Sequence, residues 1–341
     1  MKQNQFAKYL TYFMVKYLLG ERGCSPNTIS AYRDAISLFL VFMRDIYSIS
    51  ADNIDFQDIT QERVLAFLDW LENTRNCSVS TRNARLAALH AFFKFLFYKA
   101  PEHMNEWHRI LSIKIKKAPK ATVVYLTTEG IKLLLQQPDT STRRGWRDLT
   151  LLSIMYECAG RVQEMSDLVP SKVNFGKPTL LRITGKGNKT RLIPISEHST
   201  KLLRAYMKDY RLLNAEATEY PLFSNGRGDK LTRMGITAII KKYAILARKI
   251  NPSLIPPHLS PHSIRHSKAM ALQQSGVNLI CIRDILGHES VTTTEIYARI
   301  DNKQKREAIE KTSISSSYPD ELPSWQTNKG LLGWLESLGK R

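Results

Sequence analysis

Residues 180–195 read Leu180-Leu-Arg-Ile-Thr-Gly-Lys-Gly-Asn-Lys-Thr-Arg-Leu-Ile-Pro-Ile195, and this stretch decides the fold class. Alternating apolar and polar residues flank a basic turn over residues 185–191, which carries Lys186 and Lys189. Such alternation is typical of strands, and a glycine-containing turn between two of them predicts a β-hairpin. Helical periodicity precedes and follows the hairpin. We therefore predict a mainly α protein with a small antiparallel sheet over residues 173–195.

Two phrases on either side of the hairpin carry charged residues, and the second of them also carries histidine. A helical run over residues 156–160 ends in small residues and is followed by Arg161 and, three positions on, Glu164. Further along, residues 261–266 read Pro-His-Ser-Ile-Arg-His. The spacing there puts His262 and Arg265 on the same face of a helix. Alone, such a pair of histidine and arginine is often only a surface hydrogen bond.

The last phrase, residues 286–297, carries His288 and ends at Tyr297. A single tyrosine on a helix is usually a packing residue, and a Gly-Lys-Gly turn is usually only a hairpin. It is the occurrence of all these phrases in one chain that favours one shared site. Its candidate catalytic residues are Arg161, Lys186, His262, Arg265, His288 and Tyr297.

Helix signals divide the chain into domains. At 341 residues it is longer than one hydrophobic core usually supports. Helix starts at Ser25-Pro26, at Thr60 and at Ser80-Thr81 predict a four-helix N-terminal bundle, and we assign residues 1–112 to it. Lysines around Pro119 predict a basic linker over residues 113–124, which would let two domains close around a duplex.

Residues 125–311 form the second predicted domain. Helix signals return at residues 126–129, and further helices are expected near residues 147–157, 196–213, 232–250, 263–275, 279–286 and 293–310. A serine-rich stretch then opens a C-terminal tail, residues 312–341, in which apolar residues from 331 to 338 lie on one stripe of a short amphipathic helix. We hypothesise that this helix docks in trans on a neighbouring copy of the chain.

Charge predicts a polyanionic partner. The formal net charge is +19 and the pI about 9.8, which favours nucleic acid over a membrane surface. Solvated surface residues explain many of the basic positions equally well, Arg82 and Arg85 among them. The candidate DNA-binding residues are Arg82, Arg85, Lys114, Lys116, Lys117, Lys120, Lys189, Arg191 and Arg233.

Cysteine and apolar patterns narrow the class of protein. Cys24, Cys77, Cys158 and Cys281 lie far apart, with no paired spacing and no histidine cluster, so neither a zinc site nor a disulfide framework is predicted. The longest apolar run, residues 38–43, is too short to span a bilayer. We expect a soluble protein of a reducing cytoplasm, with no membrane partner.

A DNA phosphodiester suits the predicted site. Its anionic oxygens repel nucleophiles, and Arg161 and Arg265 can hold those oxygens by paired hydrogen bonds while charge develops at phosphorus. Tyr297 is the candidate nucleophile, because a phenolate that attacks in line leaves a covalent phosphotyrosine and divides the exchange into two steps.

The remaining polar residues fit proton transfer and orientation. Lys186 on its hairpin can protonate the departing oxygen. His262 is the better candidate base for the phenol, and His288 the better hydrogen-bond donor to the phosphate. Glu164 is expected to orient a partner. No acidic cluster for a divalent cation is visible, so we expect neither a metal nor another cofactor.

These phrases, from the Arg161 stretch to Tyr297, resemble the tyrosine recombinase or phage integrase family over almost the whole chain. The resemblance implies a SAM-like core-binding domain joined to an α+β catalytic domain in a clamp around DNA. It also implies site-specific recombination, in integration, excision or transposition, through a 3′-phosphotyrosine and a Holliday junction. Its partners would be double-stranded DNA with inverted half-sites and a homotetramer on paired sites, with one dimer per site.

The chain is most similar to the simpler Xer-like, integron or transposon recombinases, which implies a prokaryotic, nucleoid-associated protein. It departs from the family pattern at Ala159, where a glycine is common, and we expect a small backbone adjustment there. Two alternatives remain open: a type IB topoisomerase that reseals the same strand, and an architectural DNA-binding protein without activity. The amino-acid sequence makes no prediction about the DNA target, the spacing between cleavages or an accessory protein.

Overall fold

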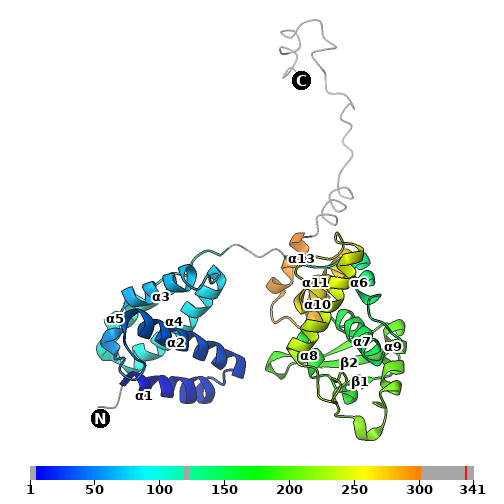
Figure 1. Ribbon diagram of the computed structural model, residues 1–341, viewed down its shortest axis with the longest axis horizontal. Helices are drawn as coiled ribbons and strands as arrows, with labels where there is room; N and C mark the ends of the chain where they lie inside the picture. Colours follow the sequence, from blue (N-terminus) through cyan, green and yellow to red (C-terminus); the bar gives the residue numbers. More distant parts are fainter. Residues whose placement is uncertain (1–4, 119–122, 301–334, 336–341) are drawn as a thin grey trace. The chain divides into compact units, whose positions relative to one another are not determined.

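The computed structural model describes residues 5–118, 123–300 and 335, and the chain forms two compact units (Figure 1). The units are Met1–Ala121 and Thr122–Arg341, each with its own hydrophobic core. The boundary falls within residues 113–124, the segment predicted to be a linker. The predicted tail from residue 312 lies outside the described residues except for Leu335. None of the described helices is long and apolar enough to cross a membrane.

The N-terminal unit is a helical bundle. Its elements are α1 (Gln5–Thr11), the π-helical η1 (Tyr12–Glu21), α2 (Pro26–Tyr47), the 3₁₀ turn η2 (Phe56–Asp58), α3 (Gln61–Asn73), α4 (Val79–Lys99), η3 (Pro101–His103) and α5 (Met104–Leu111). The predicted starts at Ser25 and Thr60 are confirmed, since both hydroxyls accept a backbone N–H of the next turn. The cap of α4 is Ser78, two residues before the predicted start.

Aromatic side chains fill this bundle. Phe13, Phe67, Phe92 and Phe93 are at most 1% exposed and contact one another or their neighbours through tilted and edge-on ring pairs. Trp107 joins them from α5, a helix that the sequence analysis did not predict. The sequence pattern does not reveal α5 because it has only 8 residues, of which Trp107 and Ile110 are buried.

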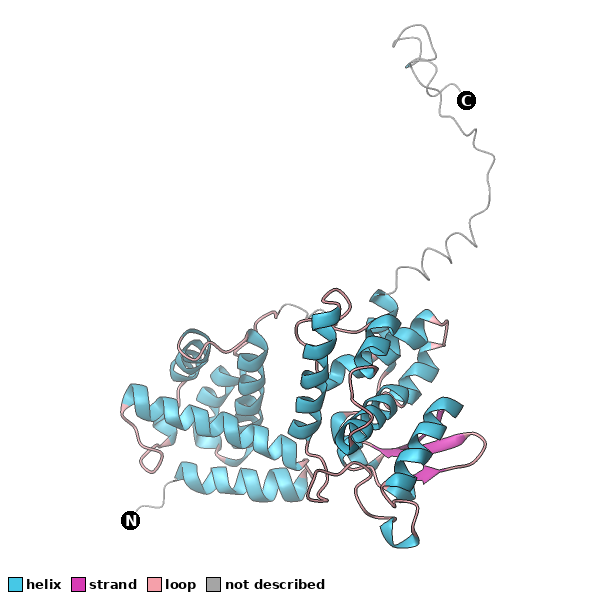
Figure 2. Ribbon diagram, turned by 45° about the vertical axis from the view of Figure 1, so that its right-hand side comes forward, coloured by secondary structure: helices cyan, strands magenta, loops and turns pink. Residues whose placement is uncertain are grey.

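The second unit combines helices with a small sheet, drawn in magenta in Figure 2. Its elements are α6 (Thr128–Leu135), α7 (Arg143–Glu157), α8 (Val162–Ser166), η4 (Pro170–Lys172), β1 (Val173–Asn174), β2 (Thr179–Thr184), η5 (Lys186–Asn188), β3 (Thr190–Ile195), α9 (Glu197–Asp209), η6 (Ala215–Ala217), α10 (Arg233–Ile250), α11 (Pro261–Gln274), α12 (Leu279–Leu286), η7 (Val291–Thr293) and α13 (Glu295–Ile300).

The predicted hairpin is confirmed. Strands β2 and β3 pair antiparallel from Thr179↔Ile195 to Thr184↔Thr190, and β1 adds to the outer side of β2. Leu181 and Ile183 are buried at alternate positions of β2, as the pattern of the sequence requires. One face of the sheet therefore belongs to the main core of the unit, and the hairpin turn projects beyond it.

A small second cluster holds α11, α12 and α13 together. Ala159, Met270, Ile282, Leu286 and Tyr297 are each at most 1% exposed and pack against one another. The cluster fixes the position of α13 through the ring of Tyr297. Two of its members, Ala159 and Leu286, also bind Arg265 of the predicted site through their carbonyls.

The first part of the predicted linker is attached to the bundle. Ile113 is buried in the bundle core, and Asn83 on α4 donates to the backbone carbonyl of Lys116 at 2.8 Å. Arg82 is 3% exposed, with Nη1 donating to the carbonyl of Lys114 at 3.4 Å. The Arg82 side chain therefore faces the protein in this arrangement, and its contact with DNA stays a prediction.

Candidate active site

Arg161 stands at the start of α8, where the chain turns from an extended conformation into the helix. Its own N–H donates to Glu164 Oε2 at 2.7 Å, and its Nη1 donates to Glu164 Oε1 at 2.9 Å. Nη2 reaches across the fold to the carbonyl of Gly287 at 3.0 Å. These contacts fix the direction of a guanidinium that remains about one-third exposed.

Arg265 approaches the same point from α11. Its Nη2 donates to the carbonyl of Leu286, the neighbour of Gly287, and its Nη1 donates to the carbonyl of Ala159 at 2.8 Å. Arg265 is 3% exposed, so these carbonyls replace water for much of its charge. Two guanidiniums far apart in sequence are thus bound to adjacent carbonyls at the end of α12.

Glu164 ties the arginines together. In addition to the two bonds from Arg161, its carboxylate accepts Nη1 and Nη2 of Arg191 at 2.9 and 2.7 Å. Burial by itself would raise the pKa of Glu164, but the hydrogen bonds and charge of Arg191 and Arg161 hold that pKa below its ordinary value. The carboxylate is therefore ionised and orients both guanidiniums, as predicted for a supporting residue.

Arg191 is bound inside the protein by Glu164 and by the end of α12. Besides its two bonds to Glu164, its Nε donates to the carbonyl of Ile285 at 2.9 Å. Its side chain is 12% exposed. These contacts connect β3 to α12 and to Glu164. The DNA contact predicted from its position beside the basic turn stays a prediction.

The departure from the family pattern has a structural consequence. Ala159 adopts a left-handed conformation with φ of 47°, which an alanine tolerates less well than a glycine. This turn sends the Ala159 carbonyl toward Arg265 and lets the chain reverse before Arg161. Where a small backbone adjustment was expected, the structure has a strained residue that is buried beside Arg265.

Two glycines allow close approach around the arginines. A Cβ at Gly185 would lie 3.0 Å from Glu164 Oε1, and one at Gly287 would lie 3.0 Å from Arg191 Nη1. Gly287 also has φ of 64° and ends α12 in the left-handed conformation. Lys186 follows Gly185, so its backbone lies at the edge of the arginine cluster. The Lys186 side chain lies outside the described part of the chain.

The histidines flank the guanidiniums. His262 begins α11 one turn before Arg265, and His288 follows Gly287 with Nδ1 in a 3.0 Å hydrogen bond to the Thr294 hydroxyl. Partial burial and the charges of Arg265 and Arg161 lower the pKa of both, to about 4 for His288. An anion bound between the arginines would offset that repulsion and raise the pKa of each histidine.

Tyr297 points inward. It is 0% exposed, and its hydroxyl lies 2.7 Å from Nδ1 of His266, one turn beyond His262 on α11. Burial raises the pKa of Tyr297 to about 12, although Arg265 opposes the shift. The phenol is therefore protonated at neutral pH and is hydrogen-bonded to His266.

The surface over these residues is hollow. A depression of about 570 Å³ is lined by Arg161, Gly185, Lys189, Arg191, Gly287, His288 and neighbouring residues. Its floor holds the arginine contacts just described, and its rim carries the basic hairpin. The arrangement can bind an anion at the surface and bring it against two fixed guanidiniums.

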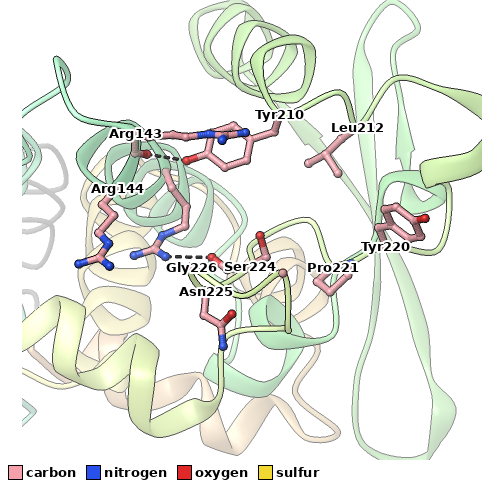
Figure 3. A pocket seen from close by; sticks show the side chains of 11 residues that line it. Arg143, Arg144, Tyr210, Leu212, Tyr220, Pro221, Ser224, Asn225 and Gly226 are labelled. Atoms are coloured by element: carbon pink, nitrogen blue, oxygen red, sulfur yellow. Dashed lines mark hydrogen bonds between the residues drawn. The ribbon is translucent and has the colours of Figure 1, made fainter.

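A second hollow of about 560 Å³ lies between the start of α7 and the loop over residues 220–228 (Figure 3). Arg147 holds the loop by donating to the carbonyl of Ser224 at 2.9 Å, and it pairs with Asp148 at 2.7 Å. Arg143 stacks on the ring of Tyr210 at 4.8 Å. None of the predicted catalytic residues lines this hollow.

Comparison with known proteins identifies the family of both units. Residues 124–304 match the model described as the phage integrase family, and residues 13–99 match that of the phage integrase N-terminal SAM-like domain. The chain belongs to the phage integrase family. It is thereby a tyrosine recombinase, an enzyme of site-specific recombination, as the resemblance of its motifs predicted.

Individual relatives of this integrase-family chain agree. It is 34% identical over 337 residues to the putative integrase/recombinase y4rC of Sinorhizobium fredii, covering 99% of both chains. Tyrosine recombinase XerC of Roseiflexus sp. is 31% identical over 300 residues, which cover 86% of this chain and 90% of that protein.

Solved structures share the fold. The XerH site-specific recombinase bound to difH substrate gives a TM-score of 0.65 at 23% identity, covering 86% of this chain and 82% of that one. The Tn1549 transposon integrase in complex with transposon right end DNA gives 0.67 at 15% identity, covering 88% and 98%. The predicted fold, mainly α with a small antiparallel sheet in a two-domain recombinase, is confirmed.

The other basic residues predicted to bind DNA are scattered over both units. Arg85 is partly buried and donates to the carbonyl of Ala31 at 3.2 Å. Lys189 and Lys116 are exposed and pair with Glu289 and Glu72. The residues Lys114, Lys117 and Arg233 are exposed, whereas Lys120 lies outside the described residues.

Sequence reasoning overlooked His266. It stands in the phrase that supplied His262 and Arg265, and its spacing of four from His262 indicated the same helix face. What the sequence could not indicate is which histidine the buried phenol would meet. That depends on where α13 packs, and the small apolar cluster decides it.

Proposed function

We propose that this protein is a site-specific DNA recombinase that cleaves and rejoins strands through a 3′-phosphotyrosine at Tyr297 and a Holliday junction, in integration, excision or transposition. The observation that carries the proposal is the convergence of Arg161 and Arg265 on adjacent carbonyls, beside a hollow with a basic rim. Their remaining N–H groups can bind the non-bridging oxygens of one phosphate.

The surrounding residues divide the reaction between them. Glu164, itself held by Arg191, keeps the Arg161 guanidinium in place, and the carbonyls of Ala159 and Leu286 hold that of Arg265. Charge that develops at phosphorus therefore meets donors already oriented. His288, anchored through Thr294, is placed to donate to a phosphate oxygen. Lys186, in the hairpin turn, protonates the departing 5′ oxygen. No step in this scheme requires a metal or a cofactor.

The partners proposed are a duplex with inverted half-sites, one dimer per site and a homotetramer on paired sites. Support comes from relatives of the same fold that were solved with their DNA, the XerH recombinase and the Tn1549 integrase. The net charge of +19 and exposed lysines such as Lys114 and Lys117 suit contacts to phosphates that do not depend on sequence.

A nicked suicide substrate tests the cleavage step. Once the strand is cut beside the nick, the short end diffuses away, and the protein remains covalently attached to DNA. We expect a shifted adduct with the wild type and with Tyr220→Phe, an exposed tyrosine outside the site, and none with Tyr297→Phe. An adduct that persists in Tyr297→Phe excludes the proposed nucleophile.

Exchange between two labelled sites then distinguishes a recombinase from a topoisomerase. A recombinase produces strands that join the two sites, and the junction intermediate accumulates when the second exchange is blocked. A type IB topoisomerase relaxes a supercoiled plasmid without joining sites. An architectural protein binds the DNA and gives neither product nor adduct.

A further inference from the structure

The nucleophile proposed above has a specific neighbour. The Tyr297 hydroxyl lies 2.7 Å from Nδ1 of His266, a short and direct contact between side chains of α13 and α11. The two rings are inclined by 56° with centroids 5.7 Å apart, so the contact joins the polar edges of the rings. His262, which the sequence made the candidate base, begins the helix and lies near the arginines.

His266 is in the state required of an acceptor. Burial, followed by the charges of His262 and Arg265, lowers the pKa of His266 to about 4, so the ring is neutral at pH 7. The Tyr297 phenol is protonated, and in the tautomer with the ring proton on Nε2 it donates to the lone pair of Nδ1. A base at this contact requires that tautomer.

On the basis of the proposed function, we infer that His266 is a further catalytic residue: the base that takes the proton of Tyr297 as the phenol attacks DNA. The Oη–H bond breaks and the proton passes to Nδ1, the Oη–P bond forms, and the P–O5′ bond breaks with its electron pair on O5′. O5′ takes a proton from the general acid. In rejoining, His266 returns its proton to the phenolic oxygen.

The energetics of the step are reasonable for a neutral imidazole. A phenolic oxygen that is bonding to phosphorus becomes far more acidic than a free phenol, so its proton must leave as the bond forms. A phosphate between the arginines also offsets the charge that now depresses the pKa of His266. General base catalysis of this kind typically accelerates a reaction by ~10² to 10⁴.

Several titratable groups surround His266 and belong to the expected pH behaviour. His262 and Arg265 lie on its own helix, and Tyr297 faces it from α13. His288 is close enough for the charge of His266 to lower the pKa of His288. Tyr125, before α6, packs against the same apolar cluster. Of these, only Tyr297 is hydrogen-bonded to the His266 ring among the described residues, so replacing that ring acts first on the nucleophile.

The test is the pH dependence of adduct formation on a 5′-bridging phosphorothiolate substrate. Its leaving group needs no proton, so a single-turnover rate reports the loss of the proton from the nucleophile. The variant is His266→Asn, because an asparagine amide places a hydrogen-bond acceptor close to the position of Nδ1 but cannot take up a proton. The matched control is His198→Asn, an exposed histidine on α9.

We expect the wild type and His198→Asn to react at a rate that changes little from pH 6 to 9. His266→Asn should react ~10²-fold more slowly at pH 7, with a rate that rises about tenfold per pH unit because hydroxide replaces the base. A rate within threefold of the wild type, or a slow rate with the flat wild-type profile, overturns the inference, since His266 would then only hold the ring.

Two controls keep these outcomes apart. If His266→Asn melts far below the wild type, the same profile is taken with His266→Gln, which also offers an amide acceptor, and the criteria are unchanged. Absence of an adduct from the wild type itself overturns the proposed function, and the role of His266 with it. An adduct from the wild type with an unaltered His266→Asn rate overturns the role of His266 alone.

Discussion

Glu164 is the residue on which the geometry of the candidate site depends most. One carboxylate accepts Nη1 and Nη2 of Arg191 and the backbone N–H and Nη1 of Arg161, so a single side chain orients the two arginines. It is 6% exposed, and an uncharged replacement leaves two guanidiniums without their shared anion.

Glu164→Gln should lower the free energy of unfolding by about 3 kcal/mol at pH 7, because it breaks a buried ionic network. The folded-state pKa of Glu164 lies below its ordinary value of 4.5, so the folded protein favours the ionised form. Its contribution is then complete above pH 4.5 and is lost as the pH falls through the lower folded value. Urea unfolding at pH 7 and at pH 3.5 measures the difference between variant and wild type.

The contribution of Glu164 should be smaller at the acidic pH. A difference that is equal at both values contradicts the assignment of an ionised carboxylate. Gln163→Ala, a substitution next to Glu164 at an exposed position, serves as the control and should show no such dependence.

The sequence indicates which residues are charged, but not which way their side chains point in the fold. The supporting role of Glu164 was predicted, because a carboxylate three positions after an arginine can reach back to it. Arg82 and Arg191 were assigned to DNA because they are basic, yet both turn into the protein. Their partners, the carbonyls of Lys114 and Ile285, lie far away in the sequence, so no local pattern indicates these contacts.

At the scale of elements, the end of α12 organises the site. The helix stops at Gly287 in a left-handed conformation, and its last carbonyls then bind Arg265, Arg191 and Arg161 in place of the next helical turn. A helix C-terminus carries partial negative charge, which suits three bound guanidiniums. The conformation of one glycine therefore controls the position of three cations.

Gly287→Ala should be more harmful than the same change at Gly276. Both glycines have positive φ, but a Cβ at Gly276 meets nothing within 4 Å, whereas one at Gly287 lies 3.0 Å from Arg191. Gly276→Ala should therefore cost about 1 kcal/mol of backbone strain and leave cleavage intact. Gly287→Ala should cost more and slow cleavage at least tenfold, measured by thermal unfolding and adduct formation. Equal effects of the two changes contradict the role given to Gly287.

The β2–β3 hairpin makes a separate prediction about Lys186. If its ammonium protonates the leaving oxygen, Lys186→Ala should cleave ordinary DNA ~10²-fold or more slowly. A 5′-bridging phosphorothiolate substrate needs no such proton and should restore the rate. Lys189→Ala, in the same turn, is the control and should not require this substrate. Failure of the rescue moves the general acid to another residue.

Elements with a strong period were predicted from the sequence, and short ones were not. The hairpin and the long helices α2, α3, α7, α10 and α11 follow from alternation or from helical spacing with polar caps. The helix α5 has two buried residues, and α8 has five residues in all, so neither repeats a pattern often enough to be recognised. Both are held by tertiary contacts.

At the scale of the whole molecule, the sequence predicted two domains joined by a linker over residues 113–124. The structure divides into two compact units after Ala121. The prediction that the six candidate catalytic residues share one site rested only on the order of their phrases along the chain. The contacts that bring Arg161 and Arg265 to α12 span more than 100 residues and 21 residues, respectively, and no local pattern reveals them.

The excess of positive charge predicts salt-sensitive binding. Lys114→Gln and Lys117→Gln should each weaken binding to any DNA sequence and reduce the slope of log K against log salt by about 1. Lys116→Gln should have a smaller effect, because that ammonium already pairs with Glu72. Lys201→Gln on α9, paired with Glu197, is the control. Fluorescence anisotropy from 50 to 300 mM salt measures the slopes, and equal slopes in all variants contradict the assignment.

The central claim is that Tyr297 becomes covalently joined to the 3′ phosphate of a cut strand. The most direct measurement is mass spectrometry of the protein–DNA adduct after digestion with protease and nuclease, which identifies both the residue and the end of DNA attached to it. The account predicts a peptide with a 3′-linked nucleotide on Tyr297. A nucleotide on any other residue, or attachment through a 5′ phosphate, would contradict it.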